Sequence, residues 1–408
     1  MLEVTGNTSE PSIAQELSES QLWSERWNLS PEKQSVLQQL AQFRSNTTPT
    51  VSTNVDKTQG NEYAVSLFKQ MKIVSGRVFQ DQWRDPVYLY SKILLSSLLA
   101  LLNGISFFDS PLDLQGVTDL LFSIFLATQL FSCNIDQLVI PHFVKNRSLF
   151  EARERNSNTY SWVVFIAANV LVEAFWQTIV AVPVFAAWCY PAGLQRNGNS
   201  AMGTVERGAV SFLLIWLFNL WSSTISQAFA AGFQLARMAI QIATLFYWLA
   251  LVFCGILTPP GELVRFWIFL YRVSPITYLL EGLAVAGVSG TQITCSSVET
   301  VHIPFPRESS SHTCGEYLAP YASASGGQVM NPLEDLDCQY CPYSDVNSIL
   351  AVFGMDPKNA WRDVGLMAAY VVFNTDNIWH LLLASASSKP IATSASQRRR
   401  CQEVEGAA

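Results

Sequence analysis

Two long apolar runs separated by a short charged stretch decide the fold of this chain. The first, residues 119–143, reads DLLFSIFLATQLFSCNIDQLVIPHF, and the second, residues 160–188, reads YSWVVFIAANVLVEAFWQTIVAVPVFAAW. Each exceeds the roughly 20 apolar residues that a helix needs to cross a bilayer. Because a backbone in lipid must satisfy its own hydrogen bonds, both runs are predicted to be helices. The stretch between them, SLFEARERNSN at 148–158, is too charged for hydrocarbon and is expected to meet the cytosol.

The composition of the whole chain also indicates a membrane protein. Half of the 408 residues are hydrophobic and only 14% are charged, against about 25% in soluble domains. The net charge of −7 argues against a nucleic-acid-binding protein, which normally carries a basic face. The first 60 residues contain no apolar core of a signal peptide, so insertion is expected to depend on the internal apolar runs.

Working outward from the two runs, the sequence predicts an all-α polytopic membrane protein. Residues 1–60 are expected to be a cytosolic linker, with a short helix that begins after Ser30 at Pro31. The amphipathic stretch 61–84 is predicted to be a connecting helix in the headgroup region, the alternative being a surface helix on a soluble domain. The membrane part, residues 85–289, and a weak last span at 361–386 are predicted to supply six spans, at 86–108, 119–142, 160–188, 208–230, 238–257 and 363–386. Two shorter apolar pieces, 263–273 and 276–288, are too short to cross and are predicted to be re-entrant.

The basic residues set the expected orientation. Lys145, Arg147, Arg153 and Arg155 lie in the charged loop, and the tail at 387–408 carries further lysine and arginine. Basic loops stay in the cytosol, so both termini are predicted to be cytosolic, although Arg196 and Arg207 in the loop 189–207 weakly contradict this.

The same orientation places the polar loop 290–360 outside, in an oxidising compartment. That loop holds Cys295, Cys314, Cys338 and Cys341, for which two disulfides are expected. Four cysteines allow three pairings, and the sequence does not choose among them. A zinc site is the alternative for Cys338 and Cys341.

Three charged residues within the spans need an explanation. Lys92, near the start of the first span, is expected to extend toward the interface, and Asp136 is expected to reach water from the cytosolic end of its span. Glu173 lies in the middle of the third span, where an acid costs roughly 2.5 to 3.5 kcal/mol on insertion scales. It should therefore face the bundle interior with a partner, either as part of a polar coupling relay or as a helix-packing contact.

Two helix faces suit an apolar ligand. The second span carries Thr128, Gln129 and Phe131, and the fifth carries Gln241, Thr244 and Trp248 at i, i+3 and i+7. Aromatic surface with a few polar groups is typical of pockets for hydrophobic molecules. Ordinary helix packing is the alternative for both faces.

Sequence motifs for catalysis are missing from this chain. It contains no phosphate-binding G-x-x-x-x-G-K-[ST] motif, no H-E-x-x-H and no G-x-S-x-G, and only four histidines. No catalytic residue, no metal site and no cofactor in this chain is therefore predicted, and nucleotide hydrolysis by the chain itself is not expected.

Six stretches of the sequence carry a family resemblance that runs from residue 1 to about residue 373. They are WRDPVYLYSK at 83–92, LFEARERNSNTYSW at 149–162, FCGILTPP at 253–260, YRVSPITYL at 271–279, CGEYLAPY at 314–321 and CQYCPYSD at 338–345. In this order and spacing the chain resembles the second membrane half of fungal pleiotropic-drug-resistance ABC transporters of the G subfamily, and 1–4 resemble the end of their second nucleotide-binding domain.

The resemblance implies the permease portion of an ATP-driven exporter of hydrophobic drugs or lipid-like molecules, in the plasma membrane. ATP and Mg²⁺ would be bound by nucleotide-binding domains of another chain, which would also supply a second transmembrane half. Closure of those domains would be transmitted by the connecting helix and by the charged-loop residues Glu151, Arg153, Glu154 and Arg155. Thr128, Phe131, Thr244 and Trp248 would match cavity positions, and Glu173 would match the buried acid of the third helix.

One departure from the family suggests alternatives. Family members continue the sixth helix with apolar residues, whereas 373–380 reads FNTDNIWH, which makes insertion marginal. A second hypothesis is therefore a truncated, transport-inactive membrane remnant or an interaction partner of a full-length transporter. A third is a secondary transporter that uses Glu173 as a proton site. Many secondary transporters are built from inverted repeats, and the sequence shows none.

Overall fold

The computed structural model describes most of the chain: residues 27–46, 63, 65–111, 113–155, 157–194, 202–305 and 313–387, with the side chains of 43–46, 131–134 and 383–387 excepted. The chain divides into two units, Met1–Glu62 and Tyr63–Ala408. In the first unit, helix α2 (Pro31–Asn46) begins as predicted, because the Ser30 hydroxyl oxygen accepts a hydrogen bond from the Lys33 amide at 3.2 Å.

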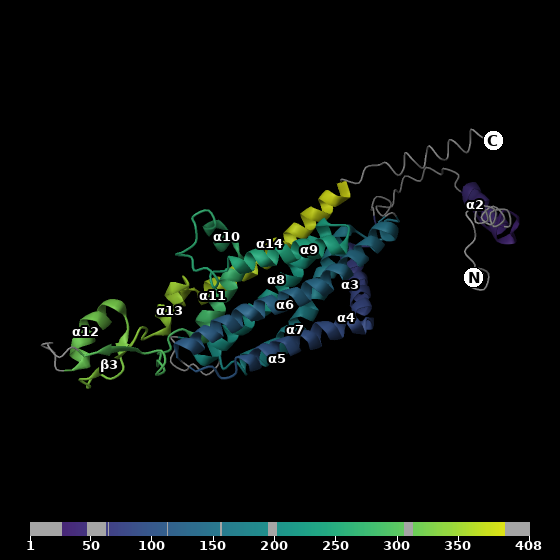
Figure 1. Cartoon of the computed structure of the whole chain (residues 1–408). Helices are drawn as coiled ribbons and strands as arrows, with labels where there is room; N and C mark the ends of the chain where they lie inside the picture. Colours follow the sequence, from purple (N-terminus) through teal and green to yellow (C-terminus); the bar gives the residue numbers. More distant parts are fainter. Residues whose placement is uncertain are drawn as a thin grey trace, which may run out of the picture. The chain divides into compact units, whose positions relative to one another are not determined.

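The second unit is a helical bundle with a small lobe (Figure 1). Two π-helical turns, η2 and η3, continue neighbouring α-helices, so that α4, η2 and α5 form one rod and η3 extends α6. The bundle helices are α3 (Leu67–Arg84), α4 (Pro86–Tyr90), η2 (Ser91–Leu95), α5 (Ser96–Ser106), α6 (Leu114–Leu149), η3 (Phe150–Glu154), α7 (Trp162–Cys189), α8 (Thr204–Gly232), α9 (Ala236–Val252), α10 (Ile268–Val273), α11 (Pro275–Val288) and α14 (Ala360–Ser387).

Four helices in the described part of the chain are long and apolar enough to cross a membrane. They are Pro86–Ser106, Leu114–Glu154, Trp162–Cys189 and Thr204–Gly232, which confirms the first four predicted spans as helices. The predicted fifth span is the 17-residue α9. The predicted sixth is the continuous 28-residue α14, which does not meet the same criterion of length and apolar composition. That α9 and α14 cross the bilayer therefore stays a prediction.

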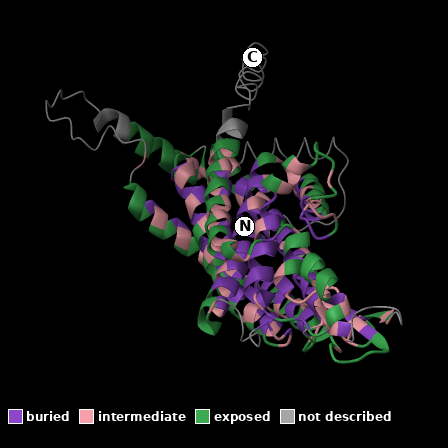
Figure 2. Ribbon diagram, turned by 90° about the vertical axis from the view of Figure 1, so that its left-hand side faces the viewer, coloured by how far each residue is buried: buried purple, intermediate pink, exposed green. Residues whose placement is uncertain are grey.

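Helix α8 lies at the centre of the bundle. It packs against α6, α7, α9, α11 and α14, and most of its residues are buried. Figure 2 shows the buried residues gathered inside the bundle and the exposed ones on its outer surface. Because α8 is covered on nearly all sides beyond its first turn, its serines, Asn219 and Thr224 are buried inside the protein.

The two short apolar pieces behave differently. Every residue of α11 except Tyr278 is buried, and α11 begins with Pro275 in its first turn, where the missing amide proton costs nothing. In contrast, α10 has no buried residue. Only the second piece is thus part of the bundle core, and the re-entrant path of both through lipid stays a prediction.

The polar loop folds into a lobe that corrects the all-α prediction. It contains the helices α12 (Cys314–Ser325), α13 (Val346–Val352) and η4 (Pro357–Asn359) and a three-stranded antiparallel sheet of order β1-β3-β2, formed by β1 (Val301–Pro304), β2 (Gln328–Val329) and β3 (Asp337–Cys341). In Figure 1 the part that holds α12 and β3 lies at the opposite end of the bundle from α3. Strands this short give little signal in a sequence, and cross-linking helps to hold them.

Two disulfides select one of the three possible pairings. Cys314 at the start of α12 pairs with Cys338 in β3, and Cys295 pairs with Cys341 at the end of β3. All four half-cystines are buried. Both cysteines of the CQYC motif are thereby engaged by other partners, which contradicts the zinc alternative.

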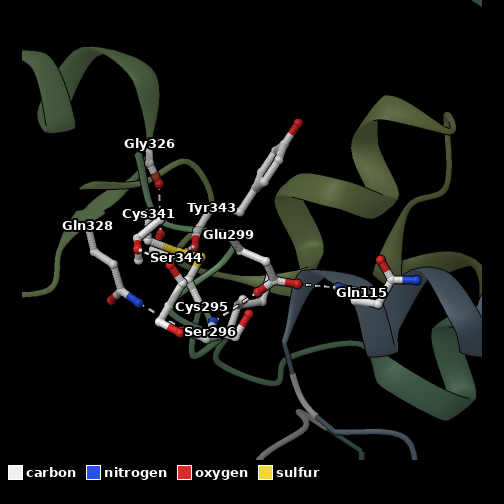
Figure 3. The surroundings of a disulfide bond; sticks show 12 residues. Gln115, Cys295, Ser296, Glu299, Gly326, Gln328, Cys341, Tyr343 and Ser344 are labelled. Carbon is white, nitrogen blue, oxygen red and sulfur yellow. Dashed lines mark hydrogen bonds between the residues drawn. A yellow bond between two sulfur atoms is a disulfide. The ribbon is translucent and has the colours of Figure 1, made fainter. Parts of the chain in front are cut away.

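A carboxylate joins this lobe to the bundle (Figure 3). Glu299 accepts hydrogen bonds from the Ser296 amide at 2.9 Å and from the Gln115 amide in the first turn of α6 at 2.8 Å. Burial by itself would raise the pKa of Glu299, but these amide donors hold it below its ordinary value. The N-terminal end of α6 thus has a fixed negative charge against its unpaired amides, which stabilises a helix start.

Candidate functional site

The centre of the candidate site is a buried ion pair between Lys92 of η2 and Glu173 of α7. Their side chains are 1% and 2% exposed. Lys92 Nζ donates to Glu173 Oε1 and to the Tyr88 hydroxyl at 2.7 Å, and that hydroxyl donates to Glu173 Oε2 at 2.8 Å. The expectation that Lys92 extends to the interface is therefore wrong, because a carboxylate in the bundle interior satisfies its charge.

Two glutamines complete the surroundings of this pair. Gln177 Nε2 donates to Glu173 Oε1 at 2.9 Å, and Gln82 Nε2 of α3 lies 3.5 Å from Oε2. A buried ion pair is tolerated only when further hydrogen bonds satisfy its remaining atoms. The structure thus places Glu173 inside the bundle with a cationic partner, and its role in coupling stays a prediction.

Helix α3 packs on α7 through a face that combines valines with glutamines. Its buried residues recur every four positions, at Gln70, Val74, Val78 and Gln82. The aromatic rings of Phe79 and Trp83 stack on Trp176 of α7, with ring centroids 5.3 and 5.9 Å apart. On the same helix, Phe68 is 84% exposed and lies outside this buried face. The two glutamines of this face have partners of their own: Gln70 accepts from the Ser161 amide just before α7, and Gln82 lies against Glu173 of α7.

A second network joins α3 to η3, the π-helical turn that ends α6. Arg77 contacts both carboxylate oxygens of Glu154 and donates to the Tyr160 hydroxyl at 2.9 Å, and Tyr160 in turn donates to Glu154. The hydrogen bond to the Glu154 carboxylate raises the pKa of Arg77, so the guanidinium stays charged. Glu154, predicted as a coupling residue from sequence, is the member of η3 that contacts α3.

The other predicted coupling residues lie around the same π-helical turn. Glu151 comes within 4.0 Å of Arg147 Nε one turn earlier, and Arg153 and Arg155 are exposed. From the sequence, Arg147 is expected only to help orient the chain in the membrane. It is buried, and it donates to the carbonyls of Ala230, Ala231 and Phe233 at 2.6, 2.7 and 2.6 Å. No sequence pattern predicts these hydrogen bonds, because they depend on the position at which α8 ends.

A cavity of about 280 Å³ opens between α3, the end of α6 with η3, and α7. Its walls combine apolar surface with charges of both signs. The lining residues are Arg77, Val78, Asp81, Lys145, Asn146, Leu149, Arg153, Glu154, Phe165 and Asn169. Both members of the Arg77–Glu154 pair line this cavity.

The residues of the predicted ligand faces on α6 and α9 differ in their exposure. On α9, Trp248 is 53% exposed and Gln241 is exposed, whereas Thr244 is half-buried and donates to the Ile240 carbonyl. On α6, Thr128 is 2% exposed and donates to the Phe125 carbonyl, so it faces the bundle, while Gln129 is half-buried. The side chain of Phe131 lies outside the described residues. The role of these residues in binding stays a prediction.

Known proteins are similar in sequence to this chain over most of its length. Residues 69–286 match the family model described as ABC-2 type transporter. The chain is 41% identical over 354 residues to ABC multidrug transporter C of Aspergillus fumigatus, covering 86% of this chain and 23% of that protein. It is 38% identical over 363 residues to ABC multidrug transporter AFR2 of Cryptococcus neoformans var. grubii, covering 86% and 24%.

A third relative is ABC transporter eupT of a Phoma species, 38% identical over 375 residues, with 92% of this chain and 26% of that protein covered. The chain thus spans about a quarter of the length of these curated relatives. The matched region contains the Lys92–Glu173 pair, the Arg77–Glu154 pair and both predicted ligand faces. On this evidence of sequence and fold, the chain belongs to the ABC-2 type transporter family.

Proposed function

We propose that this chain is the permease portion of an ATP-driven exporter that moves hydrophobic drugs or lipid-like molecules out of the cell. ATP and Mg²⁺ are bound by nucleotide-binding domains, which act on the cytosolic end of the chain, and a second transmembrane half completes the transport path. The names of the relatives, which include multidrug transporters, support this function, as does the arrangement of charges at the cytosolic end.

The single observation that carries the proposal is the Lys92–Glu173 cluster. It joins α3 through Gln82, the first span through Tyr88 and Lys92, and the third span through Glu173. A buried polar network of this kind has few alternative arrangements, because any displaced partner would be left unsatisfied. A movement of α3 is therefore passed to two spans together instead of being absorbed by side-chain rearrangement.

The cytosolic cavity supplies the place where that movement begins. In the proposed mechanism a segment of the nucleotide-binding domain enters the cavity beside Arg77, Arg153 and Glu154 and presses on α3 and η3. The Arg77–Glu154 contact keeps these two elements together. Domain closure then moves the ends of the first, second and third spans as one body.

The drug is proposed to bind on the outer faces of α6 and α9. Large apolar side chains on α9 are exposed, among them Ile242, Leu245, Trp248 and Leu249, and on α6 Phe122 and Leu126 are exposed. Contiguous apolar surface with few polar groups suits hydrophobic molecules and the facing half of a transporter. Alternation of this surface between the inside and the outside would constitute transport.

The topology proposed for this function has six spans in the plasma membrane, with α9 as the fifth and α14 as the sixth. Both termini are cytosolic, α10 and α11 form a re-entrant pair, and the disulfide-bearing lobe is extracellular. Oxidised cysteines in that lobe are consistent with an outer location.

A reconstitution experiment tests the proposed function. The chain is co-expressed with a separate chain that carries two nucleotide-binding domains and the other transmembrane half, and the complex is placed in lipid nanodiscs. Addition of hydrophobic drugs is expected to change its ATPase rate. A complex that contains the double variant K92M/E173Q should still assemble but should lose this response.

Two outcomes would reject the proposal. If the chain does not associate with the ATPase-bearing chain, or associates without any drug response, it is a transport-inactive remnant or an interaction partner. If drug transport in vesicles collapses with the pH gradient while ATP is present, the chain is part of a secondary transporter.

A further inference from the structure

Asp136 of α6 is a buried acid without a cationic partner in the described part of the chain. It is 3% exposed, so the expectation that it reaches water is wrong. In the described residues its carboxylate accepts a hydrogen bond at Oδ1 from the Ser226 hydroxyl of α8. A carboxylate inside a membrane bundle is costly unless a cation or several donors compensate it, and one hydroxyl does not replace a cation.

Charged side chains in other parts of the bundle have partners of their own. Within the described residues, the Ser226 hydroxyl is the one side-chain group that interacts electrostatically with the Asp136 carboxylate. No titratable group of α5, α7, α8, α9 or α14 does so. Lys92 of the first span is held by Glu173, and Arg147 is held by the carbonyls at the end of α8. His142, further along α6, lies against Asp81 of α3 at 3.3 Å.

The helix that faces Asp136 carries buried polar groups of its own. Ser226 lies among Ser222, Ser223, Thr224 and Gln227, all buried. The Ser222 hydroxyl and Gln227 Oε1 have no hydrogen-bond partner in the described residues. Buried polar atoms of this kind are ordinarily satisfied by internal water. The α6–α8 contact is thus a hydrophilic part of the bundle interior.

A series of polar contacts leads from this region to the cytosolic cavity. Gln227 Nε2 lies 3.5 Å from the Asn169 carbonyl, Asn146 Nδ2 lies 3.4 Å from Asn169 Oδ1, and Asn146 also lies 3.4 Å from His142 Nδ1. Asp81, the partner of His142, is 50% exposed and lines the cavity with Asn146 and Asn169. These polar contacts therefore extend from the cavity to Gln227 of α8, the helix that also carries Ser226.

From these contacts we propose that Asp136 is a proton-binding site inside the bundle, reached from the cytosolic cavity along the path His142, Asn146, Asn169 and Gln227. The ligand is a proton delivered by cytosolic water. It adds to the Asp136 oxygen that Ser226 does not contact, which turns the carboxylate into a neutral acid, and it returns to water by the same path.

The proton decides whether α6 can stay packed against α8. The neutral acid keeps the Ser226 hydrogen bond in a low-dielectric interior at little cost, whereas a carboxylate must be hydrated, which pulls α6 and α8 apart. Glu173 is less suited to this role, because Lys92 already compensates its charge. The proposal concerns this chain alone and holds whether or not the chain exports drugs.

Infrared spectroscopy of the full chain in nanodiscs provides the test. At neutral pH the wild-type chain should show the carbonyl stretch of a protonated, buried carboxylic acid, and Asp136→Asn should remove that component. Asp119→Asn, which alters an acid at the outer end of the same helix, is the matched control and should leave it unchanged. Ser226→Ala keeps the acid but removes its hydrogen bond, so the band should shift in frequency.

The stability of the same samples gives a second measurement. If the folded chain holds a proton on Asp136 that the unfolded chain releases, the unfolding equilibrium constant should rise by up to about tenfold per pH unit as the pH increases. This dependence should be absent from D136N. A band that persists in D136N, or an identical pH profile in the two proteins, would overturn the proposal. Should D136N fail to fold, an unshifted band in S226A would overturn it instead.

Discussion

Lys92 and Glu173 are 81 residues apart in the sequence, yet their side chains meet inside the bundle with almost no exposure to solvent. The lysine lies in the π-helical turn η2, which interrupts the α-helix of the first span. A π-turn changes the direction in which the following side chains point, and such turns are frequent at functional sites. The irregular turn and the buried charge therefore occur together.

Removal of one partner of this pair should damage the protein more than removal of both. Lys92→Met or Glu173→Gln alone leaves an uncompensated buried group and should cost about 3 to 5 kcal/mol of stability. The double variant K92M/E173Q should recover most of this loss. Thermal unfolding of the four proteins in one detergent forms a double-mutant cycle. Additive single losses would show that the two residues do not interact.

The Arg77–Glu154 pair should matter for coupling more than for stability. Arg77 is half-exposed in this pair, and exposed ion pairs contribute about 1 kcal/mol or less. Arg77→Ala should therefore change thermal stability little but reduce the drug response of the ATPase in the reconstituted complex. Lys72→Ala, at an exposed position of the same helix, is the matched control and should preserve that response. Equal effects of the two variants would contradict a specific role for Arg77.

The sequence predicted the elements of this fold better than their contacts. Apolar length was sufficient to place α6, α7 and α8, because a helix that crosses lipid needs no tertiary partner to form. The start of α2 after Ser30, at Pro31, could also be predicted, because the preferences for these residues at a helix start are local. Both signals are local, so neither depends on how the chain packs.

The contacts of the charged residues could not be predicted in this way. The expectations that Lys92 extends to the interface and that Asp136 reaches water considered each side chain on its own helix alone. Tertiary packing buries both side chains. The buried face of α3 uses Gln70 and Gln82 because their partners are the Ser161 amide and Glu173. The cysteine pairing likewise depends on strand register. All of these contacts form between segments that are distant in the sequence, so no local sequence pattern predicts them.

Each disulfide should contribute measurably to the lobe. Loss of the Cys314–Cys338 bond, which closes a loop of 24 residues, should cost about 3 kcal/mol by the chain-entropy estimate. Cys314→Ser with Cys338→Ser should therefore unfold α12 at a lower temperature than the rest of the lobe. Peptide mapping without reduction should recover Cys314 with Cys338 and Cys295 with Cys341. Recovery of either other pairing would contradict the structure.

The contact between Glu299 and α6 should weaken in acid. Its pKa is lowered in the folded protein, so its contribution is fully present above the unfolded carboxyl pKa of about 4.3. The contribution is lost as the pH falls through the lower folded value. Protection of the Gln115 amide against hydrogen exchange, measured relative to its intrinsic exchange rate, should therefore fall below about pH 4. In Glu299→Gln, the Gln115 amide should already be less protected at neutral pH, because the variant loses on the order of 1 kcal/mol of stabilisation at the helix start. The acid dependence of its protection should also be smaller. An unchanged acid profile in this variant would show that another group is responsible.

Thr128 and Trp248, both predicted from sequence to face a drug cavity, should respond differently to substitution. Trp248 is 53% exposed on α9, whereas Thr128 is 2% exposed and faces the bundle. Trp248→Ala should therefore raise the drug concentration needed for half-maximal ATPase response about tenfold, equivalent to 1.4 kcal/mol of lost binding, with little change in thermal stability. Thr128→Val keeps the shape of the side chain and should leave the drug response unchanged while lowering stability slightly, because its hydroxyl donates to the Phe125 carbonyl. Drug titrations of both variants in the reconstituted complex measure the difference. A response altered by T128V and not by W248A would place the cavity on the opposite face of α6.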